Sequence, residues 1–460
     1  MDSKDNFRKI RMVIAKVTSS CNLRCKYCCT DAVPLTKPGA TMTMATHKRA
    51  VSLLIGNTQN NEVQWIFHGG EPMLLPVAWY EEAIEHCIAV AEANPHLKQL
   101  MIGMQSNLTR LSPEYLALIK KYRIQVGTSL DGPPKLSDVY RQGGKRVEES
   151  IELLACEGAP AGVIALINKN TIRHLDEVVD YFDQKGFGVT FNATCPTGRG
   201  TNLEDLTGDE LCAAKRAVLE RADKSGNRRL LSPDLAKQIF HFHTGERDMT
   251  ERTCHDYNCG AGVSLIGMDP NGDLWPCGRS SDAGLGRFGN VNDLESFAGY
   301  PATLTKFHEK DPWYARCFGC AAKLICMFGC TAFDKESIPT REMDCSATKL
   351  LYQYFCDHPD LIARLFERIQ IDMQKMKQHV AIKKPPPPFL RLHTGSHPCS
   401  GCTSCTPQPT QDDSTVTIEL SAKVGAAVQG EPIAFRPRFA TMQSKAPAAP
   451  EESYETITTH

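Results

Sequence analysis

Three cysteines near the N-terminus have the spacing of ligands to an iron–sulfur cluster. Cys21, Cys25 and Cys28 are separated by three and then two residues, directly after an apolar segment over residues 11–18. A [4Fe–4S] cluster normally takes four cysteines, so a loop that supplies three leaves one iron open. An open iron can bind S-adenosylmethionine (SAM) through its amino and carboxylate groups for one-electron cleavage. The alternative is a zinc loop, although zinc loops usually pair two Cys-x-x-Cys halves.

A second group of cysteines lies in the second half of the chain and has the ligand count of two further clusters. Its eight members are Cys254, Cys259, Cys277, Cys317, Cys320, Cys326, Cys330 and Cys345. Eight thiolates are the ligands of two fully coordinated [4Fe–4S] clusters. Two tetrahedral zinc sites with four thiolates each are the alternative. Between these cysteines, the run from Asp269 to Asp273 predicts a tight turn between two short strands.

A glycine-rich motif follows the strand pattern over residues 63–68. It consists of Gly69, Gly70, Glu71 and Pro72. Two glycines let a backbone approach a ligand closely, and we expect their N–H groups to donate to the amino-acid end of SAM. An ordinary turn at the end of a strand is the alternative.

A polar motif follows the strand pattern over residues 124–130. It contains Ser129 and Asp131, with Asp138 and Arg141 shortly afterwards. A hydroxyl, carboxylates and a guanidinium at one strand end suit the recognition of ribose and carboxylate groups. Because Asp-Gly-Pro is also a common turn signal, the alternative is a loop without a ligand.

The elements that must position these residues alternate along the first half of the chain. Strand patterns cover residues 11–18, 63–68, 99–105, 124–130, 161–167 and 187–194, and helix patterns cover residues 44–57, 77–93, 112–121, 145–157, 171–185 and 207–223. Six β-α units in order predict a parallel sheet with right-handed crossovers. Since eight units close a full barrel, six predict an α/β fold of the partial (β/α)6 TIM-barrel type. Reactive groups then gather beyond the C-terminal ends of the strands, where these motifs lie.

Composition argues against several classes of protein. The 460 residues carry a formal net charge of −1, so no global field attracts nucleic acid or an anionic membrane. The sequence shows neither a signal-peptide pattern nor an apolar run of about 18 residues, which predicts no membrane span. Twenty cysteines without an export signal predict a cytoplasmic protein whose thiols serve metals or redox chemistry.

The motifs over residues 10–225 together resemble those of the radical SAM enzymes. The cysteine triplet, with Tyr27 before its third member, and the Gly-Gly-Glu-Pro run match the signatures of that family. The SAM contacts that this resemblance implies are Tyr27 along the adenine, Gly69, Gly70 and Glu71 at the methionyl end, and Ser129 and Arg141 at the ribose and carboxylate.

The second cysteine group resembles the SPASM domain, the twin-cluster extension of radical SAM enzymes that modify peptides and proteins. This match spans residues 250–350. The resemblance implies an inner auxiliary cluster held by Cys254, Cys259, Cys277 and Cys330, and an outer one held by Cys317, Cys320, Cys326 and Cys345. It therefore implies three [4Fe–4S] clusters besides SAM, a peptide or protein substrate, and an electron donor of the flavodoxin or ferredoxin type.

We expect four parts along the chain: a radical SAM partial barrel at 1–235, a SPASM domain at 236–350, a helical segment at 351–382 and a Pro-rich tail at 383–460. Four prolines at 385–388 start a semi-rigid linker, and the composition beyond them predicts disorder. The tail contains Cys399, Cys402 and Cys405. These cysteines are a further metal site in one interpretation and an exposed segment without fixed ligands in the other.

One position distinguishes two functions. Anaerobic sulfatase-maturating enzymes are similar by this pattern and have an aspartate base directly after the cysteine that corresponds to Cys277, whereas this chain has Gly278. Glycine cannot accept a proton, and the sequence identifies no other general base. We therefore expect a maturase that forms a thioether or carbon–carbon crosslink in a ribosomally made peptide. The alternatives are formylglycine formation in a sulfatase and a non-catalytic iron–sulfur electron carrier or scaffold.

Overall fold

The first half of the chain alternates strands and helices in the order that the hydrophobic patterns predict. The computed structural model describes residues 7–30, 32–194, 197–247, 254, 259–309, 312–326, 328–334 and 338–382. Its first six strands are β1 (Met12–Thr18), β2 (Glu62–Gly69), β3 (Gln99–Gln105), β4 (Gln125–Ser129), β5 (Gly162–Ile167) and β6 (Val189–Ala193). They pair in parallel in this order, so their C-terminal ends share one edge.

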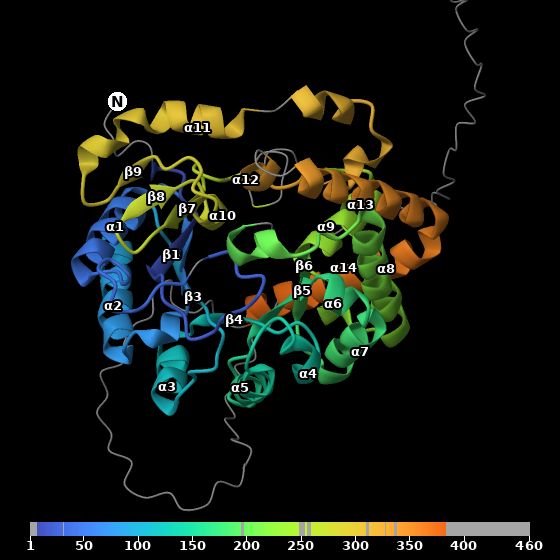
Figure 1. Ribbon diagram of the computed structural model, residues 1–460, viewed down its shortest axis with the longest axis horizontal. Coiled ribbons are helices and arrows are strands. Elements are labelled where there is room, and N and C mark those ends of the chain that lie inside the picture. Colours follow the sequence, from blue (N-terminus) through green and yellow to red (C-terminus); the bar gives the residue numbers. More distant parts are fainter. Residues whose placement is uncertain are drawn as a thin grey trace, which may run out of the picture. The chain divides into compact units, whose positions relative to one another are not determined.

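Helices connect consecutive strands and surround the sheet (Figure 1). They are α1 (Met44–Asn57), α2 (Val77–Ala93), α3 (Pro113–Tyr122), α4 (Pro134–Ser137), α5 (Gly144–Cys156), α6 (Lys169–Ile172), α7 (Leu175–Lys185) and α8 (Gly208–Ser225). The side chains of Thr43, Ser112 and Thr207 accept backbone N–H bonds at the starts of α1, α3 and α8, as N-cap residues do. The predicted partial TIM-type barrel is confirmed.

The sheet continues beyond β1, which the sequence patterns do not predict. Strand β7 (Leu265–Met268), from the cysteine-rich half, pairs in parallel with β1, and β8 (Asp273–Trp275) and β9 (Gly289–Asn290) follow as antiparallel strands. The order of the nine-stranded sheet is β6-β5-β4-β3-β2-β1-β7-β8-β9. The turn between β7 and β8 is the predicted tight one, with Gly272 at a φ of 91°. Strand β1 is therefore hydrogen-bonded along both of its edges.

The rest of the described chain is mainly helical. Its helices are α9 (Pro233–Thr244), α10 (Gly278–Asp282), α11 (Tyr300–His308), α12 (Thr331–Asp334), α13 (Ile338–Asp357) and α14 (Pro359–Ile382). Helix α13 packs on α8, and α14 packs on α9. None of the helices in the described part of the chain has an apolar stretch long enough to cross a lipid bilayer. The predicted Pro-rich tail over residues 383–460, with its three cysteines, lies outside the described residues.

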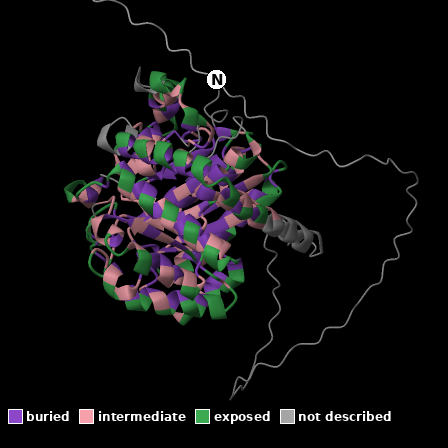
Figure 2. Ribbon diagram, turned by 90° about the vertical axis from the view of Figure 1, so that its right-hand side faces the viewer, coloured by how far each residue is buried: buried purple, intermediate pink, exposed green. Residues whose placement is uncertain are grey.

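The main core lies between the strands and the helices that cover them. Figure 2 shows buried residues along the strands and on the inner faces of the helices. The alternate residues Val63, Trp65 and Phe67 of β2 are fully buried, as expected for one face of a strand. The rings of Phe67 and Tyr80 meet edge to face with centroids 5.1 Å apart. This packing fixes α2 against the sheet and so fixes the end of β2.

One histidine belongs to this core. His47 of α1 is fully buried, and its ring meets that of Trp65 edge to face. Its Nε2 lies 3.1 Å from the carbonyl oxygen of Ala83. Burial lowers the pKa of His47 to about 4, because the charged ring would lose its hydration. At neutral pH the ring is uncharged and serves packing.

We predict that His47 makes the protein less stable as the pH falls from about 6.5 towards 4. In this window the unfolded chain protonates the ring at its ordinary pKa, whereas the folded chain does so only near 4, so protonation favours unfolding. The expected contribution is about 2 kcal/mol between pH 7 and 5. In thermal unfolding, His47→Gln should lose less stability over this interval than the parent chain. Equal losses would contradict the assignment.

Candidate cofactor and iron–sulfur sites

The cysteine triplet lies in the loop that follows β1, at the C-terminal edge of the barrel. Cys25 is buried, and Cys21 and Cys28 are half-buried. The three side chains form a small apolar cluster with neighbours that include Leu23 and Leu166. One loop thus presents all three thiols in a surrounding of low polarity, which limits the access of solvent to a metal group.

Neighbouring segments hold the cysteine loop through its backbone. The N–H of Lys26 donates to the carbonyl of Tyr140 at 2.8 Å, and the N–H of Arg199 donates to the carbonyl of Cys28 at 2.9 Å. Arg199 belongs to the 3-10 helix η3 (Gly198–Asn202). A Cβ on Gly198 would lie 2.6 Å from the backbone of Cys29. Sequence reasoning missed this support, because two glycines after the sixth strand are a weak signal by themselves.

The chemistry of the triplet fits a thiolate-bound cluster. The N–H of Leu23 donates to Cys21 Sγ at 3.4 Å, the kind of bond that tunes cluster sulfurs. Burial is the main cause that raises the pKa of Cys21 and of Cys25, so a metal that binds them must displace their protons. Within the described residues, no three His, Cys, Asp or Glu side chains surround a single-ion position. One loop supplies three thiols, and a backbone N–H donates to one of them, which suits a cluster held by thiolates.

The Gly-Gly-Glu-Pro run lies directly against the cysteine loop. A Cβ on Gly70 would lie 2.2 Å from the carbonyl oxygen of Ser20, so the close approach requires glycine. The N–H groups of Gly70 and Glu71 donate to the carbonyls of Thr18 and Ser20, each at 2.8 Å. The N–H of Gly69 donates to His68 Nδ1 at 2.7 Å. Both glycine N–H groups that were expected to donate to SAM are therefore engaged by the protein, and a SAM contact at this run must use other atoms.

Glu71 is fully buried and is engaged by the protein. Its carboxylate accepts bonds from the Ser106 hydroxyl at 2.7 Å, from the Asn107 N–H at 2.7 Å and from the Met73 N–H at 2.8 Å. Burial raises the pKa of Glu71, and these bonds oppose that rise. Asn107 also donates to the side chain of Asn22 in the cysteine loop at 2.9 Å. Glu71 therefore links the ends of β2 and β3 to the loop.

Tyr27 and Arg141, assigned to SAM by resemblance, meet at a buried aspartate. The Tyr27 hydroxyl donates to Asp131 Oδ2 at 2.6 Å, and Asp131 Oδ1 accepts from the Leu166 N–H at 2.9 Å. Arg141 interacts electrostatically with both Tyr27 and Asp131. The Arg141 Nε is buried and has no hydrogen-bond partner. A buried donor without an acceptor calls for a partner that the protein does not supply, and a guanidinium suits a carboxylate. Ser129 is the last residue of β4.

The later cysteines fall into two spatial groups. In the first group, Cys259 interacts electrostatically with Cys254 and Cys330, and Cys277 interacts with Cys259 and Cys330. The N–H of Ser280 donates to Cys277 Sγ at 3.3 Å. Burial raises the pKa of Cys277 to about 12. These four cysteines are the set that resemblance implies for the inner auxiliary cluster.

The second group contains the other four cysteines. Cys317 interacts electrostatically with Cys320 and Cys345, and Cys326 interacts with Cys317 and Cys345. Burial raises the pKa of Cys326 to about 11. This is the set that resemblance implies for the outer cluster. A cavity of about 180 Å³ adjoins these four thiols and extends to Phe191 of β6.

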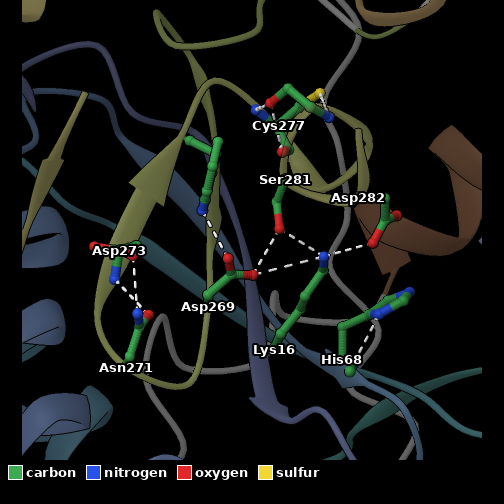
Figure 3. A network of polar contacts seen from close by, with 11 residues as sticks. Lys16, His68, Asp269, Asn271, Asp273, Cys277, Ser281 and Asp282 are labelled. Atoms are coloured by element: carbon green, nitrogen blue, oxygen red, sulfur yellow. Dashed lines mark hydrogen bonds and ion pairs between the residues drawn. The ribbon is translucent and has the colours of Figure 1, made fainter. Parts of the chain in front are cut away.

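A buried ion pair connects the barrel to the cysteine-rich half (Figure 3). Lys16 of β1 donates to the Ser281 hydroxyl and to Asp282 Oδ1 of α10, each at 2.6 Å. Asp269 Oδ1 lies 3.6 Å from the same ammonium and accepts from Ser281 at 2.6 Å. Burial alone would lower the pKa of Lys16, but the negative charges of Asp282 and Asp269 outweigh this effect and raise the pKa. The helix that follows Cys277 is thereby fixed to the strand that precedes the cysteine triplet.

Two more polar groups face this pair, and sequence reasoning assigned a role to neither. The thiol of Cys29, next to the triplet, hydrogen-bonds to Asp282. Burial is the main cause that raises the pKa of this thiol well above its usual value, and the charge of Asp282 is the second. Burial lowers the pKa of His68 to about 4, and Asp282 and Lys16 are its charged neighbours. The Gly69 N–H donates to His68 Nδ1 at 2.7 Å, so the proton of the neutral ring is on Nε2. The cluster of Lys16, Cys29, His68 and Asp282 is formed by residues that lie in separate segments of the sequence, so it is visible only in the folded structure.

Sequence comparison finds a family model for the partial barrel and its three-cysteine loop. Residues 15–206 match the model of the Radical SAM superfamily. This range contains the triplet, the Gly-Gly-Glu-Pro run and Arg141. This part of the chain is thus a radical SAM domain by sequence, and such a domain implies SAM and a [4Fe–4S] cluster as cofactors.

Relatives of the chain include enzymes that mature sulfatases. A cysteine-type anaerobic sulfatase-maturating enzyme of Clostridium novyi (strain NT) is 26% identical over 191 residues, 39% of this chain and 50% of that enzyme. The match thus spans about half the length of this relative. A serine-type anaerobic sulfatase-maturating enzyme of Klebsiella aerogenes is 22% identical over 337 residues, 70% of this chain and 79% of that enzyme. The solved structure of anSMEcpe with bound AdoMet and the Cp18Cys peptide has a TM-score of 0.61 at 19% identity, and the likeness covers 77% of this chain and 98% of that one. It shows a shared fold.

We predict that Gly70→Ala displaces the cysteine loop, because its Cβ would lie 2.2 Å from the Ser20 carbonyl oxygen. After anaerobic reconstitution, SAM binding measured by equilibrium dialysis should weaken about tenfold or more. Gly162→Ala is the matched control, since a Cβ there meets nothing within 4 Å, and it should bind SAM as the parent does. Normal binding by Gly70→Ala would contradict the role of the close approach.

We predict that Lys16→Met destabilises the protein by about 3–5 kcal/mol, because it leaves Asp282 buried without its cation. The double variant Lys16→Met with Asp282→Asn removes the uncompensated charge as well and should be more stable than the single variant. Urea unfolding of both variants measures the difference. Additive losses would show that the two side chains do not interact.

Proposed function

We propose that the protein is a radical SAM enzyme that modifies a residue within a peptide or protein and holds three [4Fe–4S] clusters. The observation that carries this proposal is a convergence at one edge of the barrel. A three-thiol loop, a glycine run pressed against it and the half-buried Arg141, whose buried Nε has no hydrogen-bond partner, meet there. In the proposal, Cys21, Cys25 and Cys28 hold the cluster that binds SAM. The eight later cysteines hold the two auxiliary clusters.

The protein's own residues bind and orient the cofactors. When bound, the cluster and SAM would supply reductive cleavage of SAM and, through it, removal of a hydrogen atom from the substrate. Tyr27, fixed by its bond to Asp131, offers a flat face to the adenine. Arg141 pairs with the carboxylate of SAM. Leu166 and the other apolar neighbours of the triplet exclude water from the reacting atoms.

A peptide is the substrate class that the surroundings support. The cavity beside β6 is lined by apolar side chains such as Phe191, Leu211 and Leu235 and by charged ones such as Lys215 and Asp234. Such a mixed lining suits an amino-acid side chain with its flanking backbone. The similar fold of anSMEcpe was solved with a peptide bound, which agrees with this choice.

Two peptide modifications compete as the outcome. A thioether or carbon–carbon crosslink in a ribosomally made peptide needs no carboxylate at Gly278. Formylglycine formation is favoured by the named functions of the relatives, and Asp282 provides a carboxylate only four residues after Gly278, in contact with Cys29. Mass spectrometry of a modified cysteine peptide separates them, because a crosslink removes hydrogen only, whereas formylglycine made from cysteine replaces sulfur by oxygen and also removes two hydrogens.

We predict that replacing Cys21, Cys25 and Cys28 together by alanine abolishes the formation of 5′-deoxyadenosine from SAM with dithionite as reductant. The auxiliary thiols are intact in this variant, so part of the iron should be retained. Anaerobic chromatography of the nucleoside product and an iron assay measure the two effects. If the parent chain held iron but left SAM intact, the protein would be an electron carrier or scaffold. Cleavage by the triple variant would refute the assignment of the triplet.

A further inference from the structure

The loop of the second thiol group carries an unusually exposed aromatic side chain. Phe318 has 81% of its surface exposed, more than any other large apolar side chain in the described part of the chain. It lies between Cys317 and Cys320, in a turn closed by a bond from the Cys320 N–H to the Cys317 carbonyl at 3.3 Å. Aromatic side chains are enriched at the centres of protein interfaces, and exposed apolar surface marks interaction sites.

Positive charge surrounds the same thiols. Arg316 directly precedes Cys317 in the chain, and Lys323 and Lys349 line the cavity beside this thiol. These three cations are exposed. The charged residues that line this cavity are the cations Lys215, Arg279, Lys323, Arg341 and Lys349 and the carboxylates Asp234 and Asp344. The excess of cations is local, because the whole chain has a formal net charge of −1.

We propose that this surface, defined by Arg316, Phe318, Lys323 and Lys349, is the docking site of an acidic one-electron carrier protein of the flavodoxin or ferredoxin class. This inference rests on the proposed function, in which SAM cleavage consumes an electron. A carrier seated on Phe318 lies over Cys317 and Cys320, its near neighbours in sequence. The carrier loses one electron and is oxidised, and the enzyme gains it and is reduced. No bond forms or breaks in this step, and no proton is transferred.

The exposure of Arg316, Lys323 and Lys349 favours binding of a partner protein over neutralisation of the cluster thiolates as the role of these cations. Cations also neutralise metal-bound thiolates, and the buried Arg341 beside Cys345 suits that role. Exposed lysines gain little from such balance, because water screens them. The same exposed charges steer an acidic protein efficiently, since complementary surface charge raises the association rate.

The test is the binding of purified flavodoxin and of purified ferredoxin to the reconstituted enzyme, measured by biolayer interferometry at low and at physiological salt. Phe318→Ala should weaken binding at least fivefold. The double variant Lys323→Glu with Lys349→Glu should weaken it at least tenfold at low salt and should reduce its dependence on salt. The controls are Leu294→Ala, which changes another exposed apolar residue, and Lys98→Glu, which lies just before β3 at the opposite end of the barrel. Both controls should bind as the parent does.

Two further measurements separate this inference from the proposed function. Iron content and dithionite-driven SAM cleavage should be unchanged in Phe318→Ala, which changes a residue outside the lining of the cavity, because dithionite needs no docking site. Lost carrier binding with this cleavage intact supports the docking site. Unchanged affinity in both surface variants, or no binding of either carrier to the parent, overturns it while the proposed function stands. Failure of the parent to cleave SAM with dithionite counts against the proposed function itself.

Discussion

The central constraint in this structure is that β1 is paired along both of its edges. Strand β2 binds one edge and β7 binds the other, so the cysteine loop that follows β1 is fixed to two halves of the chain at once. On the β2 side, the close approach of Gly70 to Ser20 holds the start of the loop. On the β7 side, Lys16 binds the helix that follows Cys277. The relative positions of the triplet and of the first later cysteine group follow from these contacts.

Much of this arrangement could be predicted from the sequence, because the periodicity of apolar residues and the spacing of cysteines can be read within short stretches of the chain. The six strand patterns correspond to β1–β6, and parallel pairing places the triplet, Gly70 and Arg141 at one edge. The pairing of β7 with β1 could not be predicted, because a four-residue strand far along the chain carries no mark of its partner. The Lys16–Asp282 pair was missed for the same reason, since the two residues lie 266 positions apart.

Chemical roles were harder to predict than positions. The sequence suggested that the N–H groups of Gly69 and Gly70 face a ligand. In the structure that of Gly69 donates to His68, and that of Gly70 holds the residues just before the cysteine loop. Likewise, Gly278 suggested that no general base follows Cys277, whereas the fold brings the carboxylate of Asp282 to Cys29, His68 and Lys16. This cluster lies between the triplet and the first later cysteine group. The identity of one residue after Cys277 is therefore a weak guide to which peptide modification occurs.

The most direct test of the account is electron paramagnetic resonance of the anaerobically reconstituted, reduced protein with and without SAM. The account predicts that SAM changes the signal of one cluster and that this signal is missing when the three cysteines after β1 are replaced. A signal that responds to SAM requires an iron with a coordination position that no cysteine occupies. A spectrum that SAM does not change, or protein that takes up zinc in place of iron, would contradict the account.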